Sequence, residues 1–435
     1  MKNTLIKILV IIVLICILGV IVYFALKEDT VSTTNTISTT EQINKKEKTQ
    51  NGNSSAEYTG ATEITEDSTF DGETFESTTG GENAILAKSG TSTLNNVTVN
   101  KSGDESDENS DFYGTNAAII ATDSATLNIN GGEVNTSGKH ANAVFSYSNS
   151  TINIEDTTIH TTSNNSGGIM VTGGGTINAK NLSVTTEGNS SAAIRSDRGG
   201  ETQIVDGGTY TANGVGSPVI YCTADVTVKN ATLVATKSEG AVVEGKNSIT
   251  LENVTLTDTN NSLNGQSSTY KNIFLYQSMS GDADEGTASF TAKNSTITTN
   301  KGDTIYVTNT KAHISLTNNK IINNDGNFLR IEAAAWGKSG SNGGDVTLDM
   351  EDQEVKGNVI VDSISTLVWN LKNSNYTGTI NGENQAKSIK LVLDSNSTLT
   401  LTGDCYVTSL EDSDNTYSNI NFNGYKLYVN GTAIN

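Results

Sequence analysis

A six-residue pattern recurs along this chain at nearly constant spacing. It consists of an apolar residue, any residue, then Asn, Asp or Gly, two further residues and a second apolar residue. Its copies begin at Leu94, Ile129, Ile154, Ala179, Val205, Val228, Leu251, Ala292 and Leu316. From the second copy to the eighth, the first residues are separated by 25, 25, 26, 23, 23 and 41 positions. A period of this size, built from strand-forming pieces, indicates a solenoid of stacked coils.

The local chemistry of each copy predicts strands that meet at a sharp corner. Apolar and polar residues alternate before the corner, as in Leu127-Asn-Ile129 and Val226-Lys-Val228, which places one face of each strand inside. The Asn, Asp or Gly lies between two strands, where the backbone needs a positive φ that these residues tolerate best. Coils stacked about 4.8 Å apart would pair in parallel. The predicted interior row is Ile119, Val144, Ile169, Ile194, Ile220 and Val243.

The N-terminal part of the chain differs from the repeats. Residues 8–26 are nineteen residues without charge, and at about 1.5 Å per residue they nearly span a bilayer core of about 30 Å. We predict that residues 1–27 form a signal-anchor helix in the cell membrane, with Lys2 and Lys7 inside and the C-terminal domain outside the cell. The alternative is a signal peptide that is cleaved to give a secreted protein, but we find no small-residue cleavage site.

The rest of the chain divides into a linker and a repeat domain. Residues 28–57 are rich in Thr, Ser and Lys and contain few apolar residues, which predicts a disordered linker. Residues 58–435 are predicted to form one β-helix, with atypical capping coils from about residue 331. In such a stack Cys222 and Cys405 would lie several coils apart, too far for a disulfide.

The net charge of −21 excludes one class of partner. A nucleic-acid backbone requires a basic surface, so we predict no nucleic-acid binding. An acidic surface agrees with solubility outside the cell.

The repeat period and corner chemistry resemble those of the right-handed parallel β-helix in the pectate-lyase-like superfold. The resemblance covers residues 83–330 best, and it is closer to the non-catalytic, adhesin-like or carbohydrate-binding surface proteins of Gram-positive bacteria. It implies an all-β fold and an extracellular protein that recognises a polysaccharide or cell-surface glycan, or that acts in adhesion. A polysaccharide lyase-type enzyme and a passive structural stalk remain as alternatives, because fold alone does not determine function.

The outward-facing side chains of the first strand in each coil provide the candidate binding site. The middle row is predicted to be Ile120, Phe145, Met170, Arg195, Tyr221 and Glu244. In the superfold that the chain resembles, this sheet commonly lines the groove that receives a sugar polymer. The resulting sugar-contact candidates are Phe145, Tyr147, Arg195, Asp197 and Tyr221. The alternative is that these are ordinary strand residues covered by loops between coils.

No set of residues predicts catalysis. A lyase of this superfold would place several calcium-binding carboxylates on coils next to an arginine, but the predicted neighbours of Arg195 are Met170, Thr172, Tyr221 and Thr223. Paired carboxylates of a hydrolase are also not evident on this face. The histidines, His140, His160 and His313, have no spacing typical of metal ligands or of a nucleophile and its base. We therefore predict that the chain is not an enzyme.

One acidic segment has spacing that suits calcium. Asp107, Asn109 and Asp111 alternate as oxygen ligands do in a calcium-binding loop. However, the sixth loop position holds Phe112 instead of Gly, and the distal Glu position holds Ala118. A solvated acidic loop is the favoured interpretation, and no other cofactor is predicted.

Overall fold

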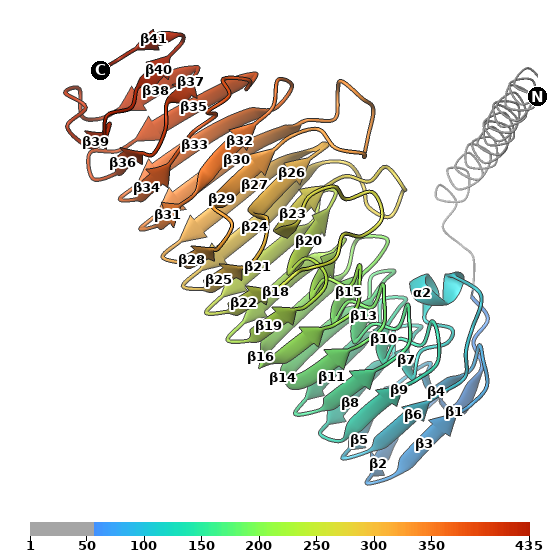
Figure 1. The fold of residues 1–435 in the computed structure, drawn as a ribbon. Helices are drawn as coiled ribbons and strands as arrows, with labels where there is room; N and C mark the ends of the chain where they lie inside the picture. The colour runs from blue at the N-terminus through green and yellow to red at the C-terminus, as the bar shows by residue number, and fades with distance from the viewer. Residues whose placement is uncertain (1–55) are drawn as a thin grey trace, which may run out of the picture. The chain divides into compact units, whose positions relative to one another are not determined.

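The structure is a computed structural model that describes residues 56–435. The predicted membrane anchor and nearly all of the predicted linker lie outside these residues. Residues 56–435 form one unit, a parallel β-solenoid of about 15 turns in which each strand pairs with its equivalent in the next coil (Figure 1). The prediction of an all-β, right-handed parallel solenoid is confirmed.

Sheet A contains one strand from each of twelve coils, and all its pairings are parallel. Its strands are β1 (Gly60–Ile64), β4 (Asn83–Ala87), β7 (Ile119–Ala121), β10 (Val144–Ser146), β13 (Ile169–Val171), β15 (Ile194–Ser196), β17 (Ile220–Cys222), β20 (Ala241–Glu244), β23 (Lys271–Tyr276), β26 (Asp303–Thr308), β29 (Asn327–Ile331) and β32 (Asn358–Val361). The outer face of this sheet is the predicted binding surface.

Sheet B forms the other two sides of each coil and has two strands per coil on either side of the corner. The strands before the corner are β2 (Thr69–Asp71), β5 (Thr91–Asn95), β8 (Thr126–Asn130), β11 (Thr151–Glu155), β14 (Thr176–Thr186), β16 (Thr202–Ala212), β18 (Asp225–Lys229), β21 (Ser248–Glu252), β24 (Thr287–Lys293), β27 (Thr310–Thr317), β30 (Gly344–Glu351), β33 (Thr366–Lys372), β35 (Ser388–Leu393) and β38 (Ser409–Asp412). Two of these, β14 and β16, continue through the corner.

The strands after the corner are β3 (Thr74–Ser77), β6 (Thr98–Lys101), β9 (Glu133–Thr136), β12 (Thr158–Thr161), β19 (Thr232–Ala235), β22 (Thr255–Asp258), β25 (Thr296–Thr299), β28 (Lys320–Asn323), β31 (Glu354–Lys356), β34 (Asn375–Gly378), β36 (Thr398–Leu401) and β39 (Ile420–Asn421). The C-terminal end carries a small third sheet of β37 (Cys405–Val407), β40 (Leu427–Val429) and β41 (Thr432–Ala433). The helix α2 (Asn109–Tyr113) has five residues, and no helix within residues 56–435 is long and apolar enough to cross a membrane.

The corners have the backbone conformation that the repeat predicts. The third residue of every copy has a positive φ, from 50° at Asn96 to 78° at Gly207. Neighbouring corners are also linked by side chains: Asn181 donates to Asp156 at 2.6 Å, and Asn318 donates to Asn294 at 2.8 Å. The first residues of all nine copies pair in one continuous ladder from Leu94 to Leu316.

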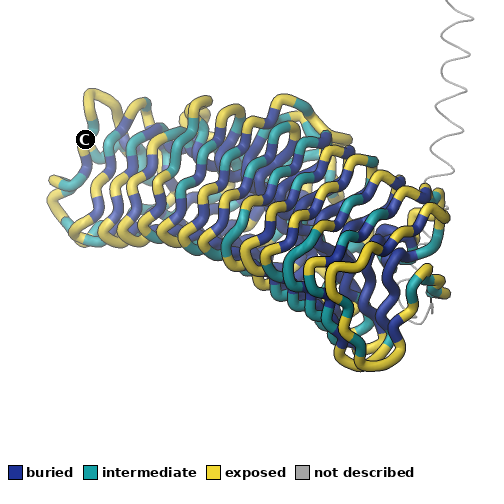
Figure 2. Tube along the Cα trace, turned by 90° about the horizontal axis from the view of Figure 1, so that it is seen from below, coloured by how far each residue is buried: buried dark blue, intermediate teal, exposed yellow. Residues whose placement is uncertain are grey.

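The core is one continuous apolar column inside the coils (Figure 2). The predicted interior row is correct from Ile119 to Ile220, but its last member is wrong. Ile220 pairs with Ala241, and Val243 pairs with Cys222. The register is therefore shifted by two residues, which keeps the same face inside.

Sheet B continues through the coils beyond residue 331, whereas sheet A ends at β32. Sheet B continues from β30 to β33 and β35 with steps of 21 and 22 residues at Asp349, Asn370 and Val392. The core there holds the fully buried Trp369. Cys222 and Cys405 are both buried and free, as the predicted stacking requires.

Candidate functional site

The outer face of sheet A is partly covered by an insertion. Phe145 and Met170 lie in the predicted outward row, but both are fully buried in a small apolar cluster with Leu86, Ala117 and Ile120. The cover is the segment that contains α2, whose C-terminal Gly114 is packed so closely that an added Cβ would lie 2.7 Å from the Phe145 ring. Phe145 is therefore covered by a loop between coils, which was the alternative to a sugar contact. A ligand does not reach it in this structure.

Tyr147 lies at the margin of the same cover. Its ring centroid is 6.2 Å from that of Tyr58 and 5.8 Å from that of Tyr113. The side chain is half-buried, and burial raises its pKa, so its hydroxyl stays protonated. Tyr147 thus belongs to the contact between α2 and the sheet, and the structure does not place it in an open groove.

Buried polar contacts hold α2 against the sheet. The Asp111 carboxylate lies 3.0 Å from His140 Nδ1, and both side chains are buried. The hydroxyl of Tyr58 donates to the carbonyl of Tyr113 at 2.7 Å, and that of Thr172 donates to the carbonyl of Phe112 at the same distance. These contacts fix the insertion over several coils of sheet A.

The predicted calcium ligands do not converge. Asn109 and Asp111 lie in α2, where residues two positions apart point to different sides. Asp107 caps the backbone N–H of Asn109 at 2.9 Å, whereas Asp111 is directed to His140. The looped arrangement that wraps a calcium ion is not formed, and no cluster of three or more His, Cys, Asp or Glu residues suited to a metal occurs within residues 56–435.

Three of the five sugar-contact candidates do come together. Arg195 on β15, Asp197 directly after it and Tyr221 on β17 line a cleft of about 200 Å³, which we call the Arg195 cleft. Its other lining residues are Phe112, Ser190, Ala192, Gly216, Pro218 and Asp282. The cleft is smaller than the roughly 300–1,000 Å³ typical of pockets for drug-sized molecules. It suits a single residue of a longer ligand.

The charges in the cleft are arranged around the arginine. Arg195 donates to the Asp197 carboxylate from Nε at 3.0 Å and from Nη2 at 2.9 Å. Burial raises the pKa of Asp197, and the guanidinium opposes this shift. The third nitrogen, Nη1, is buried and has no hydrogen-bond partner among residues 56–435. An unmet buried donor costs about 1–3 kcal/mol; because this nitrogen is enclosed, the rest of the Arg195 side chain is what lines the cleft.

Tyr221 presents its ring and not its hydroxyl to the cleft. The hydroxyl donates to Glu244 Oε2 at 2.6 Å, and the hydroxyl of Tyr276 donates to the same atom at 2.8 Å. Ser278 hydrogen-bonds the other Glu244 oxygen. Burial raises the pKa of both tyrosines well above the usual value, so both remain donors. Glu244 is a fully buried acceptor that fixes the two rings.

The sequence analysis missed an aromatic cluster that continues the row beyond Tyr221. Tyr221 pairs with Val242, which pairs with Phe274, which pairs with Tyr306. Trp336 packs on this surface with its ring centroid 5.3 Å from both Phe274 and Tyr276. The signal was the alternation in Phe274-Leu-Tyr276, but this segment lies within the 41-residue interval between Leu251 and Ala292, where the repeat gives no register.

The carboxylates and histidines near these surfaces are already engaged with other side chains. Asp197 is bound by Arg195, and Glu244 is occupied by hydroxyl donors. His140 pairs with Asp111, and His313 pairs with Asp349 at 2.7 Å on the outer surface of sheet B. These groups do not form a nucleophile with its base. Comparison with protein-family models, curated proteins and solved structures finds no match to this chain.

Proposed function

We propose that this chain is an extracellular, membrane-anchored binding protein that recognises a polysaccharide at the Arg195 cleft, as an adhesin-like member of the pectate-lyase-like superfold. The supporting observation is that the cationic side chain of Arg195 and the aromatic side chain of Tyr221, which pair on neighbouring strands, line the same cleft. Sugars offer hydroxyl acceptors together with apolar C–H faces, and a guanidinium next to an aromatic ring matches both. The outer row then extends along the coils toward Trp336, parallel to a polymer.

A glycan array with the full-length protein tests the proposal. Selective binding of oligosaccharides supports recognition. Shortening of the bound glycans would indicate a lyase-type enzyme, and the absence of any binding would leave a passive stalk. Repeating the array with calcium and then with a chelator shows whether glycan binding depends on calcium.

Substitutions in the cleft test its role. Arg195→Lys keeps a positive charge opposite Asp197 but removes the planar fork and its third nitrogen. We expect the affinity for the selected glycan to fall at least tenfold, which corresponds to about 1.4 kcal/mol. Tyr221→Ala should cause a similar loss, because it removes the ring.

Two controls separate recognition from folding. Tyr221→Phe keeps the ring but not the hydrogen bond to Glu244, so glycan affinity should stay within about threefold while stability falls by about 1–3 kcal/mol. Lys180→Ala on sheet B, outside the cleft, should change neither. If Arg195→Lys leaves the glycan affinity unchanged, the Arg195 cleft is not the glycan-binding site.

A further inference from the structure

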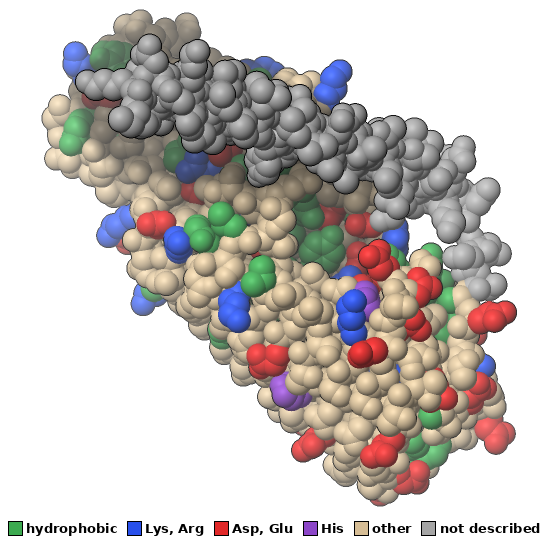
Figure 3. Space-filling model, turned by 45° about the vertical axis from the view of Figure 1, so that its right-hand side comes forward, with side chains coloured by type: hydrophobic (Ala, Val, Ile, Leu, Met, Phe, Trp, Pro, Cys, Tyr) green, Lys and Arg blue, Asp and Glu red, His purple; other side chains and the backbone are tan. Residues whose placement is uncertain are grey.

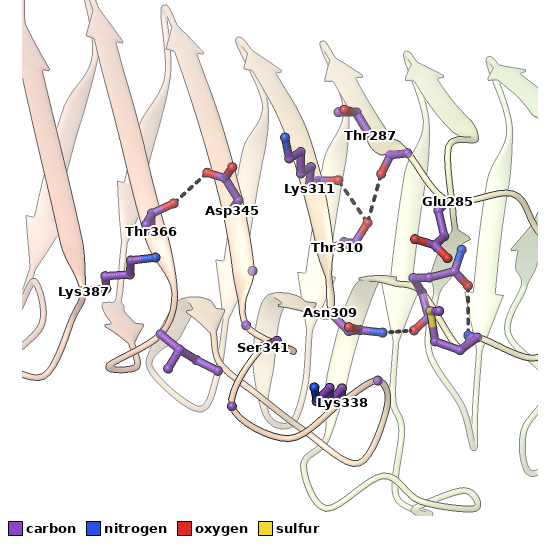
Figure 4. A pocket seen from close by; sticks show the side chains of 18 of the residues that line it. Glu285, Thr287, Asn309, Thr310, Lys311, Lys338, Ser341, Asp345, Thr366 and Lys387 are labelled. Carbon is purple, nitrogen blue, oxygen red and sulfur yellow. Dashed lines mark hydrogen bonds between the residues drawn. The ribbon is translucent and has the colours of Figure 1, made fainter.

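A second hollow lies away from the Arg195 cleft, in the C-terminal half of the solenoid. It measures about 1280 Å³ and lies beside the starts of β24, β27 and β30 and the turn before β33 (Figure 4). The segments 277–286 and 337–344 border it. We call it the lysine groove, because Lys311, Lys338 and Lys387 line it. It shares no lining residue with the cleft.

The three lysines are free to meet a ligand. None of them has an ion-pair partner among residues 56–435, whereas eight other lysines of that part of the chain are paired with carboxylates. All three are exposed. Two carboxylates, Glu285 and Asp345, also line the groove, and Asp345 accepts a hydrogen bond from Thr366 at 2.6 Å. The lining therefore carries three positive and two negative side chains, a small net positive charge in a chain whose net charge is −21.

The lysines follow the axis of the solenoid. Lys311 pairs with Asp345, Asp345 with Thr366, and Thr366 with Ser388, which directly follows Lys387. Three coil steps of about 4.8 Å separate Lys311 from Lys387 by roughly 14 Å along the axis. Lys338 comes from the loop that precedes β30 (Figure 4). Cations in this order suit a linear polymer with repeated negative charges.

The groove wall favours phosphate over planar groups. The segment from Gly337 to Gly344 contains four glycines that line the groove, and Gly337 and Gly340 have φ values of 78° and 82°. Within this segment the N–H groups of Ser341 and Gly344 already donate to the Lys338 carbonyl and to Ser365 Oγ, so these two are not available to an anion. Lysine acts as a point charge toward phosphate, whereas arginine suits planar bidentate pairing; no arginine lines the groove. No aromatic residue lines it either, so it offers no platform for stacked nucleobases.

We propose that the lysine groove binds a linear polymer of polyol or sugar units joined by phosphodiester groups, with Lys311, Lys338 and Lys387 contacting successive phosphates. On the face seen in Figure 3, acidic side chains gather over the N-terminal coils. The lysine groove lies in the C-terminal half of the stack, away from these coils, so a polyanion is repelled less there than at the N-terminal coils.

Calorimetric titration of the full-length protein with a poly(glycerol phosphate) chain, in a mild non-ionic detergent, tests this site. We expect binding at 50 mM salt that weakens at 200 mM, because exposed charges are screened. The variant Lys311→Gln/Lys338→Gln/Lys387→Gln should lose about 30-fold in affinity, at roughly threefold for each exposed charge. A control with the same charge change, Lys237→Gln/Lys293→Gln/Lys320→Gln, alters exposed lysines that do not line the groove and should bind as the parent does.

Other outcomes overturn the proposal. Equal binding of a polyuronate would assign the groove to carboxylates, and equal binding of single-stranded DNA would assign it to nucleic acid. Equal losses in the groove and control variants would show a general charge effect. If Arg195→Lys lost binding of the phosphate polymer while the groove variant kept it, the polymer would bind in the Arg195 cleft instead. Because the two sites are probed by separate variants, this proposal and the glycan proposal fail independently.

Discussion

At the scale of single residues, the corners of the coils carry the strictest requirement. Each corner turns the chain with a positive φ, which Asn, Asp and Gly tolerate best. Gly208, the residue after the corner residue Gly207, has a second constraint as well: its φ is 93°, and an added Cβ would lie 2.3 Å from the carbonyl oxygen of Leu182 in the neighbouring coil.

Gly208→Ala is expected to destabilise the solenoid strongly. The left-handed conformation alone costs about 1–2 kcal/mol for a residue with a Cβ, and the contact with the Leu182 backbone adds at least about 2 kcal/mol because the coils must shift. Thermal unfolding measures the loss. Gly72→Ala is the matched control, since Gly72 has a φ of 74° and an added Cβ there would meet no atom within 4 Å. Equal losses in both variants would contradict the close approach of the coils.

The corner residues could be predicted from the sequence, whereas the burial of Phe145 could not. Positive φ is a local property of Asn, Asp and Gly, and it shows in every copy of the repeat. The burial of Phe145 depends on α2, more than 30 residues earlier in the chain and outside the repeat. Arg195, Asp197 and Tyr221 lie together because Arg195 and Tyr221 follow the regular register of β15 and β17.

At the scale of elements, α2 acts as a fixed cover on sheet A. It contributes five residues, and its position depends on contacts such as the buried pair of Asp111 and His140. His140→Ala leaves the Asp111 carboxylate buried without this partner, which should loosen α2 by about 1–3 kcal/mol. We expect faster proteolysis between residues 104 and 116 and increased binding of a hydrophobic dye to the uncovered cluster around Phe145.

The control for this experiment is His160→Ala. His160 is exposed on β12 in sheet B and should leave the proteolysis pattern unchanged. If His140→Ala also gives the parental pattern, the histidine pair does not hold the cover in place.

The strand register shows where pattern analysis fails at this scale. A shift of two residues keeps the same face inside. The alternation of apolar and polar residues therefore cannot distinguish pairing of Ile220 with Val243 from pairing with Ala241. The actual register places Val242, not Glu244, beside Tyr221. Glu244 still reaches the hydroxyl of Tyr221, a contact across coils that no repeat pattern encodes.

At the scale of the whole molecule, buried carboxyl groups link stability to pH. Burial raises the pKa of Asp258 to about 8 and that of Glu201 to about 9, while the same groups in an unfolded chain titrate near 4. Between these values the folded state holds protons that the unfolded state has released. The stability that these groups contribute is therefore complete below about pH 4 and is lost as the pH rises toward 9.

We expect the unfolding temperature to be higher at pH 5.5 than at pH 8.5. Glu201→Gln removes one of these groups and should reduce the difference between the two pH values, whereas Glu76→Gln changes an exposed carboxyl and should not. Calorimetry across this range provides the measurement. An unfolding temperature that rises with pH would contradict the assignment of these carboxyls as buried and protonated.

The elongated stack itself could be predicted from the sequence, but the positions of the residues that line the Arg195 cleft and the lysine groove could be predicted only in part. The repeat fixes the coils, since every copy carries the same alternation and corner. Trp336 and Lys338 lie in an insertion with no counterpart in other coils, so their approach to Tyr276 and Lys311 depends on tertiary packing alone.

The central claim is that the coils of sheet A hold Arg195 and Tyr221 in a cleft that receives a sugar. A crystal structure of the protein with the oligosaccharide selected on the array tests it most directly. We predict a sugar oxygen within hydrogen-bond distance of the Arg195 guanidinium and a sugar face against the Tyr221 ring. An oligosaccharide bound elsewhere, with the Arg195 cleft empty, would contradict the account.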